Sequence, residues 1–204
     1  MMSDKGAQTR ERILDIAEAL ILQKGYSGTA IDDILAGTNL TKGAFFHHFK
    51  SKNDLAFALV ERFWQRDVEL FRGFADKARA LAEDPLQEAT IWLKLFEEQV
   101  TGHSGPPISC LFASYLYERQ QFDRRTITYV EDAFQEWAGM LGEIFERLVA
   151  WRAPRSPITA PELAEFAISV LEGGFVMAQA QQDTLALVRQ SARFRQYLQL
   201  QFGA

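Results

Sequence analysis

Apolar residues recur with helical spacing from the beginning of the chain. The first such segment matches the i, i+3, i+4, i+7, i+8 pattern of an amphipathic helix with Ile13, Ile16, Ala17, Leu20 and Ile21. We predict a helix over residues 9–24. Gly25 is expected to end it, because glycine adopts the left-handed conformation that closes many helices.

Two short helices are predicted next, separated by a turn. Thr29 with Asp32 three residues later has the form of a capping box, which opens a helix through Ala36. The sequence GTN then forms a turn. Thr41 can cap a third helix, which Phe49 ends before a polar stretch.

The remainder of the chain is also predicted to be helical. Ser51 or Asn53, together with Asp54, opens a long fourth helix, and no proline follows until Pro85. Thr159 with Glu162 forms another capping box, and Asp183 is a suitable cap for the last helix. Further helices are expected near residues 86–101, 108–121, 123–150, 160–181 and 184–201. The fold class is therefore all-α, with about nine helices. A three-helix N-terminal domain at residues 1–54 precedes a larger helical domain at residues 55–204.

Composition and charge are those of a globular protein with a local basic segment. The chain has 204 residues, 48% of them apolar, and a net charge of −5, which allows a sizeable core. Residues 1–54 carry seven basic and seven acidic side chains, so the acidic excess lies in the remainder. Residues 39–53 hold three lysines, two histidines and no acid. A segment of this kind suits a polyanion, although many lysine clusters are simply solvated surface.

Targeting signals are not visible in the sequence. The single cysteine, Cys110, excludes an intramolecular disulfide, and the N-terminus lacks a charged segment followed by an apolar run. The apolar stretch AISVLEGGFVMAQA is interrupted by Glu172 and is shorter than a membrane span. We expect a soluble, cytoplasmic protein with no membrane partner.

The order of the first elements predicts a helix-turn-helix. In that arrangement the second short helix presents its N-terminal turn to base edges in the major groove. Here that turn contains Thr41 and Lys42, which can donate hydrogen bonds, and Gly43 and Ala44, whose small size permits close approach. His47, Lys50 and Lys52 are expected to face the sugar-phosphate backbone, which would explain the missing carboxylates.

The segment RERILDIAEALILQKGYSGTAIDDIL, followed by LTKGAFFHHFKSKNDL, resembles the N-terminal DNA-binding domain of the TetR family of transcriptional regulators over residues 9–57. The resemblance implies a homodimer that binds a palindromic double-stranded DNA operator. It also implies a helical C-terminal domain that binds a small-molecule effector and releases the DNA. The residues assigned to DNA contact are Thr29, Asn39, Thr41, Lys42, Gly43, Ala44, Phe46, His47, Lys50 and Lys52.

Three residues depart from the pattern of the family. Asn39 stands where glycine is usual, but asparagine tolerates the left-handed conformation. Phe46 replaces a usual tyrosine and lacks its hydroxyl, and Ala44 replaces a frequent threonine. We expect weaker anchoring on the DNA backbone, or compensation by His47, Lys42 and the helix cap Thr29.

Aromatic side chains of the C-terminal half are candidates for an effector pocket, although most are expected to be core. The candidate set is Trp64, Phe71, Trp92, Phe96, Cys110, Phe112, Tyr115, Phe134 and Trp137. Cys110 has two interpretations: some members of the family carry a reactive cysteine near this position, where a helix start can stabilise thiolate. The alternative is a small buried side chain.

The last two predicted helices have apolar residues on more than one face, which is typical of helices that pack both on their own domain and on a partner. The predicted dimer interface contains Phe166, Val170, Gly173, Gly174, Met177, Leu187, Val188, Phe194 and Tyr197. The alternative is a thick monomer core. The paired glycines cost helix stability unless they allow close approach, at a helix crossing or in a hinge.

Metal and enzyme sites are not indicated. His47 and His48 are adjacent, so they point about 100° apart on a helix, whereas two helical ligands of one ion normally need i, i+4 spacing. We see no phosphate-binding loop, nucleophile elbow or catalytic cysteine signature. The sequence therefore predicts no catalytic residue, metal or cofactor.

The function predicted from these observations is that of a dimeric repressor released from its operator by a largely apolar or aromatic ligand. One alternative is a DNA-binding architectural or partner-recruiting protein without a small-molecule ligand. A second, suggested by Phe46 and Ala44, is a ligand-binding protein that has lost its contact with DNA.

Overall fold

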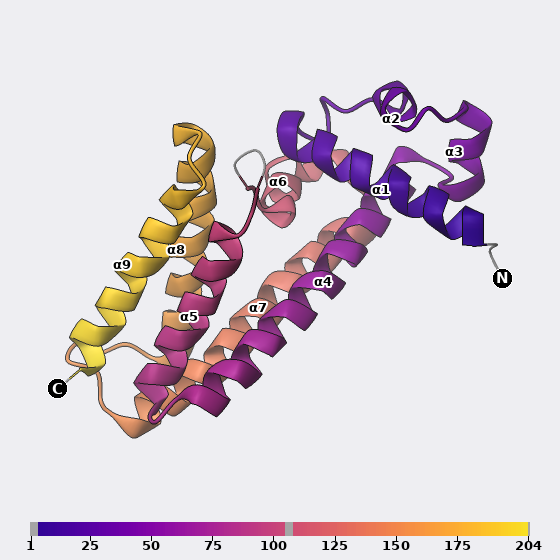
Figure 1. Ribbon diagram of the computed structural model, residues 1–204. Helices are drawn as coiled ribbons and strands as arrows, with labels where there is room; N and C mark the ends of the chain where they lie inside the picture. The colour runs from indigo at the N-terminus through magenta and orange to yellow at the C-terminus, as the bar shows by residue number, and fades with distance from the viewer. Residues whose placement is uncertain (1–3, 105–107, 204) are drawn as a thin grey trace. The chain divides into compact units, whose positions relative to one another are not determined.

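The computed structural model describes residues 4–104 and 108–203 of the chain. All regular structure in these residues is helical, which confirms the predicted all-α fold class (Figure 1). The elements are α1 (Asp4–Lys24), α2 (Ile31–Thr38), α3 (Lys42–His48), α4 (Lys52–Leu81), α5 (Pro85–Thr101), α6 (Leu111–Tyr117), the 3-10 helix η1 (Arg119–Gln121), α7 (Arg124–Trp151), α8 (Ala160–Gln181) and α9 (Leu185–Phe202).

The chain forms two compact units. The first unit comprises Met1–Arg66 and Cys110–Asp132, and the second comprises Asp67–Ser109 and Ala133–Ala204. Both α4 and α7 begin in the first unit and end in the second. The predicted division into an N-terminal domain at residues 1–54 and a C-terminal domain at residues 55–204 stays a prediction.

The core of the first unit is formed where the amphipathic faces of its helices meet. The buried side chains of α1 include Ile13, Ala17 and Ile21, which belong to the predicted apolar face, and Leu14, which the spacing did not include. Phe45 of α3 and Phe112 of α6 are fully buried as well. Burial of large apolar side chains is the main stabilising contribution in such a core.

The core of the second unit contains residues of α5, α7, α8 and α9, among them Trp92, Leu148, Leu163 and Leu198. By length and composition α8 could cross a membrane. Its inner face, with residues such as Ala167, is instead buried in this core, so its apolar character is weak evidence for a membrane span.

Most predicted helix ends are close to the observed ones, but three differ. Helix α1 begins at Asp4, five residues before the predicted start at residue 9. The N-cap of α2 is Ala30, whose N–H donates to the Asp33 carboxylate at 2.8 Å, so the capping box predicted at Thr29 and Asp32 is wrong by one residue. The predicted helix at 108–121 is shorter, because Glu118 leaves the helical conformation between α6 and η1. The capping box at Thr159 and Glu162 is confirmed.

Candidate nucleic-acid interface

Helix α3 has one buried face and one exposed face. Phe45 and Phe49 are buried in the first unit, and the Arg10 guanidinium lies 5.2 Å from the centroid of the Phe49 ring. The exposed face carries Thr41, Lys42, Gly43, Phe46, His47 and Lys50. Phe46 has 42% of its surface exposed. The structure thus brings most of the predicted DNA-contacting residues together on one face of α3.

Local contacts fix the start of this helix. Asn39 adopts the left-handed conformation with φ 54°, so the predicted tolerance of asparagine in the turn is confirmed. The Thr41 hydroxyl accepts a hydrogen bond from the Ala44 N–H at 3.2 Å and caps α3, as predicted. A β-carbon at Gly43 would meet no atom of the described chain within 4 Å. Packing within the chain therefore does not require glycine there, although glycine weakens a helix.

Two predicted DNA-contacting residues are engaged inside the first unit. Thr29 is fully buried, and its hydroxyl donates to the Gly25 carbonyl at 2.8 Å. A side chain without exposed surface cannot contact DNA, so the structure removes Thr29 from the predicted set. The Lys52 ammonium donates to the Tyr26 carbonyl at 2.5 Å and lies 3.9 Å from the centroid of the Tyr26 ring. Its contact with phosphate stays a prediction.

The charges around α3 favour an anionic partner. His48 does not add to this positive charge, because burial and the neighbouring His47 and Arg10 lower its pKa and favour the neutral imidazole. The Asp54 carboxylate, the first acid after the segment, accepts a hydrogen bond from the Lys50 backbone N–H at 2.9 Å. Lys42 and Lys50 are both exposed, and residues 39–53 contain no carboxylate that could neutralise them.

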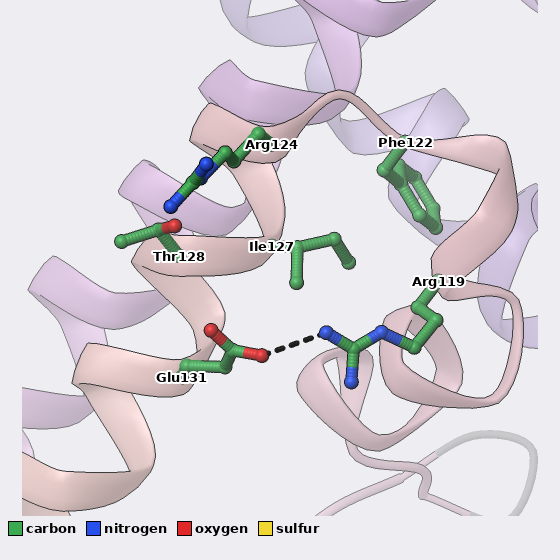
Figure 2. Close-up of a pocket in the computed structure, with 6 residues that line it drawn as sticks. All are labelled: Arg119, Phe122, Arg124, Ile127, Thr128 and Glu131. Atoms are coloured by element: carbon green, nitrogen blue, oxygen red, sulfur yellow. Dashed lines mark hydrogen bonds and ion pairs between the residues drawn. The ribbon is translucent and has the colours of Figure 1, made fainter.

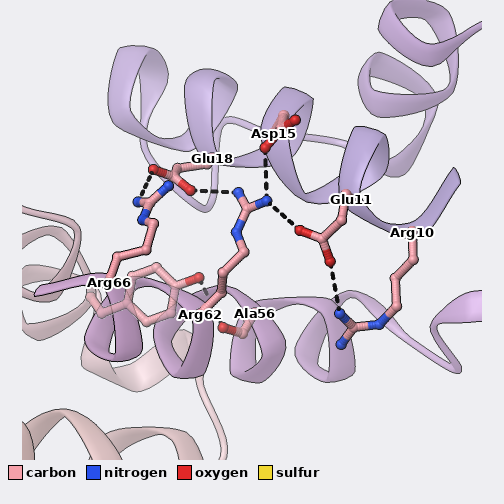
Figure 3. A network of polar contacts seen from close by, with 8 residues as sticks. Arg10, Glu11, Asp15, Glu18, Ala56, Arg62 and Arg66 are labelled. Atoms are coloured by element: carbon pink, nitrogen blue, oxygen red, sulfur yellow. Dashed lines mark hydrogen bonds and ion pairs between the residues drawn. The ribbon is translucent and has the colours of Figure 1, made fainter. Parts of the chain in front are cut away.

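A network of charges ties α1 to the first part of α4 (Figure 3). The Arg62 guanidinium donates to the Glu11, Asp15 and Glu18 carboxylates at 3.1, 2.7 and 2.6 Å. Arg66 donates to Glu18 at 2.7 Å. Only 15% of the Arg62 side chain is exposed, and partly buried ion pairs are screened less than surface pairs. The network therefore holds the two helices together within this unit.

The residues predicted to line an effector pocket fall into two clusters. Those in the first unit are Trp64, Cys110, Phe112 and Tyr115, and those in the second are Phe71, Trp92, Phe96, Phe134 and Trp137. In the second cluster the Phe71 ring lies 5.5 Å from both the Trp92 ring and the Trp137 ring. Cys110 is 4% exposed, and its Sγ accepts from the Ala113 N–H at 3.5 Å. The predicted effector site stays a prediction.

A groove of about 490 Å³ lies in the first unit at the start of α7 (Figure 2). Its lining residues are Arg119, Phe122, Arg124, Ile127, Thr128 and Glu131. Arg119 donates to Glu131 at 2.8 Å, so one of its two arginines is already neutralised. None of the predicted pocket residues lines this groove. No periodic or spacing signal in the sequence indicates this groove, because its residues come from a short 3-10 helix, a loop and the first two turns of α7.

Some residues of the predicted dimer interface are buried within the chain, and others are exposed. Gly174, Leu187 and Phe194 are buried in the second unit, so the structure removes them from the predicted surface. They pack between α8 and α9 of the same chain. Phe166 and Met177 are each 39% exposed. The other predicted members, Val170, Gly173, Val188 and Tyr197, are exposed or half-buried.

The helix-turn-helix order and the helical second unit define the class of protein as a DNA-binding regulator fold. A model of the bacterial regulatory proteins of the tetR family matches residues 13–59. A model of the C-terminal domain of LmrA/YxaF-like transcriptional regulators matches residues 85–193. Because this second match spans more than half of the chain, the chain belongs to the TetR family of transcriptional regulators, and the resemblance predicted from the sequence is confirmed.

Relatives and solved structures agree with this assignment. The chain is 26% identical over 178 residues to an uncharacterized HTH-type transcriptional regulator in the lacX 3′ region of Lactococcus lactis subsp. lactis, covering 86% of this chain and 85% of the relative. It is 37% identical over 68 residues to the HTH-type transcriptional repressor NemR of Escherichia coli, covering 31% and 34%. A TetR transcriptional regulator from Chloroflexus aurantiacus superposes with a TM-score of 0.79 at 26% identity, covering 98% of each chain.

Proposed function

We propose that the chain is a repressor that binds an inverted-repeat operator as a homodimer and is released by a small, largely apolar or aromatic effector. It acts in the cytoplasm on double-stranded DNA. The residues on the exposed face of α3 are the observation that supports DNA binding. Lys42, His47 and Lys50 are exposed there, in a segment of the sequence without an acidic residue, and a β-carbon at Gly43 would meet no neighbouring side chain.

The homodimer is supported by an apolar stripe on the exposed side of α8. The stripe contains Phe166, Gly173, Val176, Met177 and Ala180, and the small, exposed Ser169 lies between the first two. Val176 is 50% exposed. Large apolar side chains in a continuous exposed stripe are typical of a surface that a partner covers.

A change in the separation of the two DNA-binding units accounts for release. DNA requires two recognition helices about 34 to 36 Å apart, one helical turn of the duplex. Because α4 continues from the first unit into the second, a ligand bound in the second unit can select another orientation of this helix. Affinity would then fall without any change in α3.

The proposal is tested by selecting genomic DNA fragments with the purified protein and measuring affinity for the selected fragments across a salt series. We expect an inverted repeat and a steep fall of affinity with salt. Lys42→Ala should weaken binding and reduce the salt slope by about one, whereas Lys94→Ala, which removes an exposed lysine of the second unit, should change neither. Failure to enrich any sequence would contradict DNA-specific regulation.

The effector and the dimer need separate measurements. Thermal unfolding against a panel of aromatic and lipophilic compounds should reveal a stabilising ligand by mass action, and a panel without any such ligand would favour a DNA-binding protein that acts without an effector. Met177→Glu should shift sedimentation toward the monomer. The control Leu200→Glu places the same charge at an exposed position of α9 and should leave the dimer intact.

A further inference from the structure

The turn between α1 and α2 is held by one carboxylate from the end of α6. The Tyr26 N–H donates to Glu118 Oε1 at 2.7 Å, and the Ser27 N–H donates to Glu118 Oε2 at 2.9 Å. Both oxygens of a single side chain are thus bonded to two successive amides of a turn about 90 residues away in sequence. Hydrogen bonds to an ionised acceptor are roughly twice as strong as neutral ones.

Gly25 provides the space for this contact. Its φ of +79° belongs to the left-handed region, and a β-carbon there would lie 2.8 Å from Glu118 Oε1. The backbone conformation favours glycine here. The carboxylate oxygen is the far end of a flexible side chain, so a β-carbon would in addition require Glu118 to shift.

Two aromatic rings and the Asn53 amide also contact this part of the first unit. The Tyr26 ring lies 4.3 Å from the Phe122 ring, and the Phe122 ring stacks on Tyr115 of α6 at 4.1 Å. The Tyr26 hydroxyl donates to Asn53 Oδ1 at 2.6 Å. Residues 118–122 and the start of α4 therefore both contact the turn, the former through Glu118 and Phe122 and the latter through Asn53.

The turn is also bonded internally and to the start of α2. The Thr29 N–H donates to the Tyr26 carbonyl at 3.1 Å, and the Thr29 hydroxyl donates to the Gly25 carbonyl. The Asp33 carboxylate of α2 accepts from both the Ala30 N–H and the Lys24 ammonium. We therefore expect a shift at Tyr26 and Ser27 to move the start of α2, which precedes α3 in the helix-turn-helix.

We propose that Glu118 is a positioning residue: by binding the Tyr26 and Ser27 amides, it fixes α2 and α3 in the orientation that operator binding requires. The inference rests on the proposed DNA-binding function. It also identifies residues 118–122 as the segment whose displacement would release the α1–α2 turn, since Glu118 and Phe122 both belong to that segment.

The test compares Glu118→Ala and Glu118→Gln with the control Glu131→Gln. Glu131 pairs with Arg119 nearby and is exposed, so its replacement removes a charge without touching the turn. Hydrogen exchange of the Tyr26 and Ser27 amides is the first readout and needs no DNA. We expect faster exchange in Glu118→Ala, intermediate exchange in Glu118→Gln, which keeps one acceptor oxygen, and exchange as in the wild type for Glu131→Gln.

The second readout is affinity for the selected operator and for unrelated DNA, at a temperature where circular dichroism shows every variant folded. Glu118→Ala should weaken operator binding roughly tenfold or more while leaving weak binding to unrelated DNA unchanged. A merely destabilised protein would lose both in proportion. Faster exchange with unchanged operator affinity, or unchanged exchange in both Glu118 variants, would overturn the inference. Wild-type protein that selects no DNA would overturn the proposed function and the inference with it.

Discussion

Gly174 of α8 lies directly against Leu187 of α9. A β-carbon at Gly174 would stand 2.5 Å from Leu187 Cδ1 and 3.1 Å from its Cα, whereas a β-carbon at the adjacent Gly173 would meet nothing within 4 Å. The two glycines therefore differ in role. Gly174 permits the close crossing of two helices of the same chain, and Gly173 lies on the exposed apolar stripe.

Substitution of these glycines by alanine should have opposite effects on stability. Gly174→Ala forces Leu187 to move, which we expect to lower the free energy of unfolding by about 1 to 3 kcal/mol. Gly173→Ala should raise it by about 0.5 to 1 kcal/mol, because alanine is the better helix former. Urea unfolding of both variants at one protein concentration measures the difference. Equal losses in the two variants would contradict the assignment.

The ion pair between Arg147 and Glu88 should contribute far more than surface pairs of the same chemistry. Arg147 donates to both Glu88 oxygens, at 3.1 and 2.6 Å, and only 6% of the Glu88 side chain is exposed. The Arg147 side chain is 32% exposed, so water has access to the pair, and we expect Arg147→Ala to lower the unfolding free energy by about 1.5 to 3 kcal/mol. Arg119→Ala breaks the exposed pair with Glu131 and should cost less than about 1 kcal/mol. Similar losses of unfolding free energy in Arg147→Ala and Arg119→Ala would show that water solvates the Glu88 carboxylate once Arg147 is removed.

The contribution of Glu118 should depend on pH. Burial raises the pKa of its carboxyl group, but hydrogen bonds from Ser27 and Tyr26 and the charge of Lys52 outweigh burial and leave the pKa below its ordinary value. A carboxyl group whose pKa is lower in the folded state stabilises the protein fully when the pH is above its unfolded-state pKa. This contribution is lost as the pH falls through the folded-state pKa. The stability difference between wild type and Glu118→Gln should therefore be constant near neutral pH and shrink in acid. Melting curves of both proteins from pH 7 to pH 3 test this, and a difference that grows in acid would refute it.

Local sequence pattern was sufficient for the fold class and most helix limits. The spacing of Ile13 and Ala17 and the capping box at Thr159 depend on neighbours within a few residues, and such signals are readable from the chain. The wrong limits had different causes. At the start of α2 the cap is local, since Ala30 and Asp33 form the capping box one residue beyond the predicted position, whereas the end of α6 involves a distant partner. Glu118 leaves α6 and binds amides about 90 residues away, and no local pattern records that contact.

Burial was harder to predict than helicity. Phe194 and Met177 are both apolar residues of amphipathic helices, yet Phe194 is 2% exposed and Met177 39%. Periodicity identifies an apolar face but not whether the face packs on the same chain or on a partner. Thr29 is a second example. Its polar side chain and its place before a short helix suggested a contact with DNA, but the side chain is fully buried.

Cys110 should react slowly with thiol reagents in the native protein. The side chain is 4% exposed and lies at the N-cap of α6, and reaction requires access as well as thiolate character. Labelling with 5,5′-dithiobis(2-nitrobenzoate) at pH 8 should be at least about a hundredfold slower than in denaturant, because only transiently opened molecules react. Rapid labelling of the native protein would instead support the reactive interpretation, in which the helix start stabilises the thiolate.

Phe46→Tyr should strengthen operator binding. Phe46 is 42% exposed on the same face of α3 as Lys42, and its ring is held edge-on to Phe45 at 5.3 Å. The added hydroxyl could donate to a phosphate oxygen, and a single neutral hydrogen bond is worth about 0.5 to 1.5 kcal/mol, or roughly two- to tenfold in affinity. Because no charge is added, the slope of affinity against salt should stay that of the wild type.

Fluorescence anisotropy with a labelled operator compares Phe46→Tyr with the control Phe46→Leu, which keeps an apolar side chain and should not gain affinity. A tyrosine variant that binds no better than wild type, while Lys42→Ala still loses binding, would mean that the exposed face of α3 contacts DNA but the Phe46 ring does not approach a phosphate. The departure from the usual tyrosine would then leave backbone anchoring unaffected. Equal gains in the tyrosine and leucine variants would instead show that relief of ring packing against Phe45, rather than a new hydrogen bond, changes the affinity.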